Sequence, residues 1–320
     1  MKMYPFLAGL VLGSVTSASG QSLQALSSPV LMRGTATIAF RDPAAVWAKD
    51  RIYLFYTYVQ SQGEQNNVRM AVGLSTSTDL KHWTPPRILT PLDPQLNFSS
   101  PGSVFWFHGG WCMCVSSYPR PHGETFGNQD ARIWLMRSTD LEHWSAPELL
   151  RVKGPDVSQA QMGRMIDPCI FQDKDVPAQW WCLFKQNGKV HRSRSTDLAH
   201  WTYVGTIGEG ENACVIVRQG YYYLFSAPRN GIAVARSRDG DHWEPLGLLT
   251  LGQSQWPWAQ GRITAGFVLD LRSDPAFGKY VMFFHGTGPD PEPRIFDTRA
   301  CIGIAWSDDL LDWRWPGSPP

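Results

Sequence analysis

The chain consists largely of short runs of β-branched, aromatic and other apolar residues, separated by tight polar turns. In the clearest unit, two such runs flank a turn at Gln219-Gly220, and two more runs follow. Residues of these types suit half-buried strands, and a Gly-containing pair between two runs indicates a hairpin. The four runs span residues 213–218, 221–227, 231–237 and 244–250. This unit is therefore predicted to be a four-stranded antiparallel sheet.

Similar units begin near Ala44, Ser103, Cys169 and Gly266, which makes five in all. No run has the length and period of an ordinary helix. A four-stranded unit that recurs along a chain indicates a propeller blade. We therefore predict an all-β fold, a five-bladed β-propeller with four antiparallel strands per blade, as a single domain over 28–320. Residues 28–40 would supply a closing strand or simply lead into the first blade.

Each unit also contains a Ser-x-Asp-x-x-x-Trp sequence after its third strand. Ser and Asp side chains bond to nearby backbone and favour tight turns, so we expect these segments to be scaffold, with each Trp packed between blades. The pattern resembles the Asp box of sialidases, Ser-x-Asp-x-Gly-x-x-Trp, but is one residue shorter, which argues against the six-bladed sialidase family. The five copies end at Trp83, Trp144, Trp201, Trp243 and Trp313.

The composition of the chain limits the kinds of binding partner that are expected. The 320 residues are 43% hydrophobic and 18% charged, with a formal net charge of +1. A chain of this kind can bury a sizeable core, and its charge gives no reason to expect nucleic acid or an anionic membrane as a partner. We expect no nucleic acid, no membrane span and a monomer.

The N-terminus has the features of a secretory signal. Lys2 precedes an apolar run over 6–15, which is too short to span a bilayer, and small residues follow at 17–20. A signal peptide over 1–20 is predicted, and with it a secreted or periplasmic location.

Export permits disulfides among the six cysteines. Cys112 and Cys114 would share one face of a strand, a poor geometry for bonding to each other. Cys169 and Cys182 flank a predicted hairpin and could pair, although buried free thiols are an equal alternative. No cysteine pair has zinc-site spacing, and no metal ligand is predicted.

The first strands carry the candidate chemistry. In a propeller these strands line the central channel, and their starting residues meet at one mouth. Alignment of the five first strands on their apolar residues places one polar side chain in each blade at an equivalent position. Carboxylates this close raise at least one pKa, which can provide both an acid and a base near neutral pH. An Asp before Pro can also be a simple turn former. The aligned residues are Asp42, Ser100, Asp167, Glu211 and Thr264.

Three segments carry a family resemblance. The sequences at 41–46, 165–171 and 210–226 resemble the first-, third- and fourth-blade motifs of glycoside hydrolase family 43 and its five-bladed relatives in families 32, 62, 68, 117 and 130. The resemblance implies that Asp42 is a general base, that Glu211 is the general acid and that Asp167 tunes the pKa of the acid. It also implies α-L-arabinofuranosides or β-D-xylosides as substrates.

The details of these motifs favour an inverting enzyme. Retaining relatives that act on fructosides usually carry Asn-Asp-Pro-Asn in the first blade, where this chain has Arg-Asp-Pro-Ala. An inverting scheme needs its acid and base about 6.5–9.5 Å apart, so that water fits between them. The chain departs from family 43 at Ala213, where Pro is usual, and at Gly261-Arg262, where Gly-His is common. No cofactor is expected to be required, and a structural calcium ion in the central channel is left open.

Further residues near the predicted mouth are candidates for substrate binding. Arginines there could hold a carboxylate or phosphate through two parallel hydrogen bonds. Trp258, in an apparent loop, could stack on a sugar ring, and the polar segment 119–130 could wall the cleft. The candidates are Arg41, Ser100, Arg164, Trp258, Arg262, Thr264 and His285.

These observations favour an exported glycoside hydrolase that acts on an oligo- or polysaccharide. The alternatives are a non-catalytic carbohydrate-binding propeller and a phosphorolytic or retaining relative of the same fold. The three carboxylates favour an enzyme. The export signal argues against a phosphorylase, because sugar phosphates are normally made in the cytosol.

Overall fold

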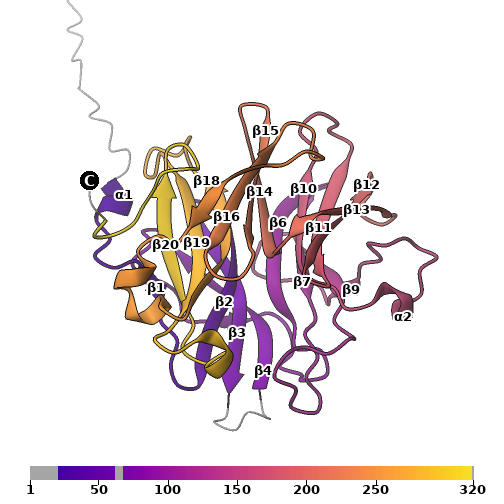
Figure 1. Ribbon diagram of the computed structural model, residues 1–320, viewed down its shortest axis with the longest axis horizontal. Coiled ribbons are helices and arrows are strands. Elements are labelled where there is room, and N and C mark those ends of the chain that lie inside the picture. The colour runs from indigo at the N-terminus through magenta and orange to yellow at the C-terminus, as the bar shows by residue number, and fades with distance from the viewer. Residues whose placement is uncertain (1–20, 62–67, 319–320) are drawn as a thin grey trace, which may run out of the picture.

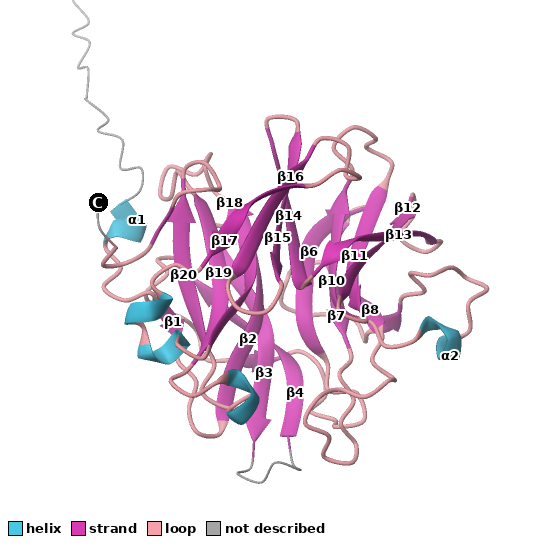
Figure 2. Cartoon of the chain, viewed as in Figure 1, coloured by secondary structure: helices cyan, strands magenta, loops and turns pink. Residues whose placement is uncertain are grey.

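The computed structural model describes residues 21–61 and 68–318. The predicted signal peptide lies outside these residues. Five antiparallel sheets make up the fold, with strands throughout the interior and the short helices at the periphery (Figures 1 and 2). This confirms the predicted five-bladed all-β propeller. Within the described ranges, no helix is both long enough and apolar enough to cross a bilayer.

The first four blades are each built from four strands that follow one another in the sequence and in the sheet. Blade 1 contains β2 (Ile38–Ala48), β3 (Arg51–Ser61), β4 (Val68–Ser77) and β5 (Arg87–Ile88). Blade 2 contains β6 (Ser99–Phe107), β7 (Gly110–Ser116), β8 (Ile133–Ser138) and β9 (Glu148–Leu149). Blade 3 contains β10 (Ile166–Gln172), β11 (Trp180–Gln186), β12 (Lys189–Ser195) and β13 (Thr202–Glu209). Blade 4 contains β14 (Glu211–Arg218), β15 (Tyr221–Ala227), β16 (Ile232–Ser237) and β17 (Glu244–Leu249).

Blade 5 joins the two ends of the described chain. It contains β18 (Arg262–Asp270), β19 (Tyr280–Thr287) and β20 (Cys301–Ser307), with β21 (Trp313–Arg314) paired to β20. Its outer strand is β1 (Val30–Met32), which also pairs with β20 and so closes the ring. Of the two roles considered for residues 28–40, the closing strand is therefore the one observed.

Short helical segments lie outside the sheets. The helix α1 (Gln21–Gln24) leads into the fold, and Leu23 and Leu26 are buried in a core shared with residues of blades 1 and 5. The packed structure thus extends before residue 28, where the domain was predicted to start. The remaining segments are α2 (Gln159–Met162), η1 (Gln253–Gln255), η2 (Pro257–Ala259) and η3 (Glu292–Arg294).

The Ser-x-Asp-x-x-x-Trp segments form the same turn in every blade. In blade 3, Ser195 Oγ accepts hydrogen bonds from the N–H groups of Asp197 and Leu198, at 3.2 and 3.0 Å. Asp197 Oδ1 then accepts from the next two backbone N–H groups, and the indole of Trp201 donates to the Leu198 carbonyl at 3.0 Å. The tryptophan side chains pack between blades, as Trp144 of blade 2 does against Phe55 of blade 1. These turns have the scaffold role that the sequence predicts.

The six cysteines are all buried free thiols. Cys169 lies opposite Leu183, whereas Cys182 lies opposite Ile170. Because neighbouring residues of a strand point to opposite faces, this one-residue offset places the two thiols on different sides of the sheet. The predicted alternative of a Cys169–Cys182 disulfide is therefore wrong.

The five inner strands share a backbone irregularity near their starts. In each of β2, β6, β10, β14 and β18 the regular pairing with the second strand of its blade is interrupted. At each interruption one residue has a positive φ, a conformation that non-glycine residues seldom adopt. These residues are Asp42 (45°), Ser100 (45°), Asp167 (55°), Asn212 (49°) and Ala265 (54°).

This backbone corrects the alignment made from the sequence. The sequence alignment makes Glu211 and Thr264 equivalent to Asp42, but in the structure Asn212 and Ala265 hold that position. The alignment is therefore one residue off in blades 4 and 5. Inner strands are apolar on both faces, so an alternating pattern does not fix their register.

Candidate functional site

A cavity of about 490 Å³ lies at the channel mouth, beside these irregularities. The three predicted catalytic residues line it together with four of the seven predicted binding residues. Beneath the cavity, the inner strands enclose a central space of about 20 Å³, which shares part of the same lining. The predicted residues that line the cavity are Asp42, Asp167, Glu211, Arg41, Ser100, Arg164 and Arg262.

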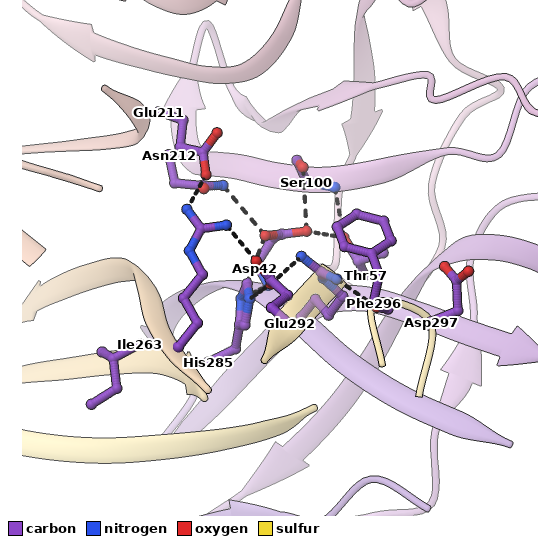
Figure 3. A network of polar contacts seen from close by, with 12 residues as sticks. Asp42, Thr57, Ser100, Glu211, Asn212, Ile263, His285, Glu292, Phe296 and Asp297 are labelled. Atoms are coloured by element: carbon purple, nitrogen blue, oxygen red, sulfur yellow. Dashed lines mark hydrogen bonds and ion pairs between the residues drawn. The ribbon is translucent and has the colours of Figure 1, made fainter. Parts of the chain in front are cut away.

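Asp42 is held by uncharged donors from three blades. Thr57 Oγ1 and Ser100 Oγ approach Asp42 Oδ2 at 2.9 and 3.4 Å, and Asn212 Nδ2 approaches Oδ1 at 3.3 Å (Figure 3). The backbone N–H of Asp42 donates to His285 Nδ1 at 3.0 Å, which fixes the strained turn. These donors suit an ionised carboxylate, which only accepts hydrogen bonds. Asp42 thus lines the cavity with both carboxylate oxygens in contact with hydrogen-bond donors.

Asp167 is buried close to two other carboxylates. Its side chain is buried, and burial together with the nearby negative charges of Glu211 and Asp42 raises its pKa to about 7. The Ser100 hydroxyl lies 2.9 Å from Asp167 Oδ1, against 3.4 Å from Asp42. A hydroxyl has one proton to donate, so its main bond is the shorter one, to Asp167. Asp167 is the carboxyl of this site that can hold a proton near neutral pH.

Glu211 is clamped between two cations. Lys185 pairs with Glu211 Oε2 and Arg262 with Oε1. Burial by itself would raise the pKa of Glu211, but the charges of Arg262 and Lys185 outweigh it and the pKa is lowered. Glu211 is therefore ionised in the described structure. This arrangement differs from the protonated carboxyl that the family resemblance implies at this position.

The ion pairs continue beyond Glu211 into a chain of alternating charges. Arg262 Nη1 also contacts Glu292 Oε2 at 2.5 Å, and Glu292 Oε1 lies 2.9 Å from Arg41 Nη2. Glu292 is buried, which favours its neutral form, but Arg41, His285 and Arg262 hold its pKa well below the usual range. The guanidinium of Arg41 lies 3.9 Å from the centre of the Phe296 ring. The cations of this network are thus held in place by carboxylates of the protein.

Several residues of the site have no counterpart in the sequence prediction. Lys185 and Thr57 lie on second strands, where they are inconspicuous among alternating positions, and Asn212 directly follows Glu211. Glu292 and Phe296 come from the segment after β19, which reaches the cavity wall. That segment is rich in Pro and has no periodicity, so a pattern of strands gives it no place in the fold.

Three of the predicted binding residues do not line the cavity. Trp258 stacks on Trp256, with ring centres 5.2 Å apart, in the core between blades 4 and 5. Thr264 and His285 face each other on paired strands and are buried. His285 supports Asp42 from behind, and burial lowers its pKa, so it is neutral. The segment 119–130 does wall the cavity, through Phe126 and Gly127.

A structural calcium ion in the central channel is left open by the sequence. Among residues 21–61 and 68–318, no three His, Cys, Asp or Glu side chains are arranged to hold a metal ion. His285, the nearest histidine to the channel, uses Nδ1 to accept the Asp42 N–H. Calcium in the channel therefore stays an open alternative.

Solved structures that resemble this chain include glycoside hydrolases. A thermostable family-43 glycoside hydrolase is 15% identical, with a TM-score of 0.62, over 92% of this chain and 98% of that chain. The catalytic domain of a family 62 α-L-arabinofuranosidase from Coprinopsis cinerea is 15% identical, with a TM-score of 0.63, over 90% and 98%. A family 117 glycoside hydrolase from Zobellia galactanivorans is 15% identical, with a TM-score of 0.61, over 89% and 94%. At this identity the likeness is a likeness of fold.

The family of the chain follows from its sequence. No curated protein matches it. Residues 16–267, well over half of the chain, match the family model of the BNR repeat-like domain. The chain therefore belongs to the BNR repeat-like domain family, and it has the five-bladed propeller fold found in glycoside hydrolases of families 43, 62 and 117.

Proposed function

We propose that the protein hydrolyses O-glycosidic bonds in an oligo- or polysaccharide. One observation carries the proposal. Asp42 and Asp167 share the Ser100 hydroxyl at the floor of the cavity, yet one is surrounded by donors and the other has its pKa raised to about 7. Two carboxyl groups in such different environments can serve as base and acid at the same pH.

Asp42 is the general base in this scheme. It removes a proton from a water molecule while the water oxygen forms a bond to the anomeric carbon. The bond from that carbon to the leaving oxygen breaks, and a carboxyl group of the site protonates the leaving oxygen. The products are a free sugar and a hydroxyl on the remainder of the glycan, and the first-formed anomer shows whether the anomeric centre is inverted.

We assign the proton donor to Asp167 rather than to Glu211. Lys185 and Arg262 hold Glu211 in its ionised form, so Glu211 has no proton to give in the free protein. Its negative charge is instead one cause of the raised pKa of Asp167. The roles that the family resemblance implies for these two carboxylates are therefore exchanged in this proposal.

The cavity also suits a sugar ring. Tyr118, Phe126 and Phe296 line one part of the wall, and Phe126 and Phe296 meet edge to face with centres 5.1 Å apart. Aromatic faces of this kind stack on the apolar faces of sugars. The first substrates to test are α-L-arabinofuranosides and β-D-xylosides. We place the reaction outside the cytoplasm, in the secreted or periplasmic location that the N-terminal sequence predicts.

A leaving-group series tests the function and the assignment together. Wild type, Asp42→Asn, Asp167→Asn and Glu211→Gln would be compared on phenyl and 2,4-dinitrophenyl glycosides, with NMR of the first-formed anomer. A dinitrophenol leaves without protonation, so loss of the true acid is felt mainly on the phenyl glycoside. We expect Asp167→Asn to retain most activity on the dinitrophenyl substrate, and Asp42→Asn to lose it on both.

Two other results would change the conclusion. If Glu211→Gln is the variant rescued by the good leaving group, Glu211 is the acid and must be freed from its cations when substrate binds. If wild type binds glycans without cleaving any, and all variants bind equally well, the protein is a carbohydrate-binding propeller instead.

A further inference from the structure

We infer that the sugar bound in this cavity carries an anionic group, a carboxylate in the first place, and that Arg164 binds it. The inference rests on the proposed function, because it names the class of substrate for the same site. Nothing in the proposed acid–base chemistry requires Arg164. Its placement therefore calls for a separate explanation.

The basic side chains that line the cavity differ in whether a carboxylate of the protein pairs with them. Arg41, Lys185 and Arg262 are each paired with Glu211 or Glu292. Arg164 lines the same cavity, but among the described residues no carboxylate lies within ion-pair distance of it. Its one hydrogen bond within those residues runs from Nε to the Gly127 carbonyl, at 3.1 Å. The two terminal nitrogens are left for a ligand.

Arg164 is also held in place before any ligand arrives. The Nε bond fixes the plane of the guanidinium at one edge, and its central carbon lies 5.4 Å from the centre of the Tyr118 ring. The side chain is half-buried. A guanidinium fixed in this way loses little entropy on binding, and its geometry matches a carboxylate through two parallel hydrogen bonds.

The charge of the whole cavity agrees with an anionic ligand. Four basic and four acidic side chains line it. One of the acidic groups, Asp167, has its pKa raised to about 7 and is largely protonated at slightly acidic pH, which leaves a net positive cavity. A partly enclosed positive cavity attracts anions more strongly than an exposed surface does.

The position of Arg164 indicates which part of the sugar it reaches. It is fixed to Gly127 and Tyr118, next to Phe126, and thus belongs to the aromatic part of the wall. Asp42, Ser100 and Asp167 form the floor. A ring stacked on the wall with its anomeric carbon above the floor would direct a peripheral substituent to Arg164. The carboxylate of a uronic acid is such a substituent, and a sulfate ester is the other source of the same charge.

Three matched sugars test this inference. Methyl β-D-xyloside, β-D-glucoside and β-D-glucuronide differ only in the group on C5, which is hydrogen, hydroxymethyl or carboxylate. Calorimetry would compare their binding to wild type, Arg164→Gln and Arg164→Lys, with the 6-sulfated glucoside as a fourth ligand. We expect the glucuronide to bind wild type at least ~10-fold more tightly than the xyloside, since hydrogen bonds between two charged groups are stronger than those between neutral groups.

The variants should show whether a loss of glucuronide binding comes from the lost positive charge or from general damage to the cavity. Arg164→Gln is expected to weaken glucuronide binding about 10–100-fold and to leave xyloside binding within about twofold. Arg164→Lys should retain part of the preference for the glucuronide over the xyloside. Lysine keeps the positive charge but lacks the two parallel N–H donors of the guanidinium. Arg294→Gln is the matched control, an exposed arginine of the same face that does not line the cavity.

The inference fails if wild type binds the xyloside and the glucuronide equally, or if Arg164→Gln weakens both to the same extent. Tighter binding of the sulfated sugar than of the glucuronide would make sulfate the recognised group. The proposed function fails separately. Selective binding of the glucuronide without cleavage of the aryl glucuronide would overturn hydrolysis and leave the anion site standing.

Discussion

The outer turns and the channel mouth repeat five times in different ways. At the outer turns both the backbone and the side chains recur, and Ser, Asp and Trp make the same hydrogen bonds in each blade. At the mouth only the backbone recurs. The residue with positive φ differs in nearly every blade, being Asp42, Ser100, Asp167, Asn212 or Ala265. Repeated side chains therefore mark the scaffold, and differing side chains on a repeated backbone mark the site of chemistry.

The strained backbone at the mouth belongs to the propeller rather than to catalysis. Ala265 has no functional group, yet it has the same conformation as Asp42 and Asp167. A positive φ at a non-glycine residue costs roughly 1–3 kcal/mol, so neighbouring contacts must stabilise it in every blade. One such contact is the hydrogen bond from the Asp42 N–H to His285. The fold thus presents five positions to one cavity, and the sequence of each blade decides what they carry.

The largest difference between the two regions is expected when one aspartate of each is replaced. Asp42→Asn should lower kcat about 10²–10⁴-fold, because the site loses its base, while the melting temperature changes little. Asp197→Ala, at an outer turn, should do the reverse, since it removes the acceptor of two backbone hydrogen bonds in a turn that does not line the cavity. Kinetic assays and thermal unfolding of both variants measure these two opposite effects on kcat and on the melting temperature. A loss of activity without a loss of stability in Asp197→Ala would contradict the scaffold role of the turns.

A smaller effect, of opposite sign in the two regions, is expected in the dependence of stability on pH. Burial raises the pKa of Asp167 to about 7, so the folded state holds this proton more tightly than the unfolded state does. The contribution of Asp167 to stability is therefore lost as the pH rises from about 4 to about 7. Hydrogen bonds lower the pKa of Asp197, so its contribution is present above about pH 4 and is lost as the pH falls.

Asp167→Asn should remove the first of these effects. Relative to wild type, we expect the variant to be about 2–4 kcal/mol more stable above pH 7 and no more stable near pH 4, since a neutral amide replaces the buried charge. Urea unfolding at several pH values measures this difference. His285 titrates in an overlapping range with the opposite sign, because burial lowers its pKa, but it is present in both proteins and cancels. A constant difference from pH 4 to 8 would show that Asp167 has an ordinary pKa.

The features that the sequence could predict follow the same division between the outer turns and the channel mouth. Strand composition, the turn repeats and the blade number could be predicted, because each depends on local periodicity or recurrence. The cluster of Asp42, Asp167 and Glu211 could also be placed at one mouth. The equivalence of Asn212, rather than Glu211, to Asp42 could not be predicted, because a bulge in a strand that is apolar on both faces leaves the register undetermined.

The electrostatic character of the site depends on contacts between distant segments. Lys185 and Arg262 come from blades 3 and 5, and their convergence on Glu211 has no signature in local sequence. The same is true of Glu292, which reaches Arg41 from the other end of the chain. Only the folded arrangement shows that the pKa of Glu211 is lowered and that of Asp167 is raised.

The smallest predicted effect compares two serines. Ser195→Ala at an outer turn should lower the free energy of unfolding by about 1 kcal/mol and leave kinetics unchanged, because Ser195 Oγ accepts two backbone hydrogen bonds that water can partly replace. Ser100→Ala removes a donor to Asp167 instead, so the pKa of Asp167 should rise further and the alkaline limb of the pH–rate profile should move to higher pH. Urea unfolding and pH–rate profiles of both variants test this pair. If Ser100→Ala left that limb in place while Ser195→Ala moved it, the titrating acid would not be Asp167, and the division between scaffold and site would have to be drawn elsewhere.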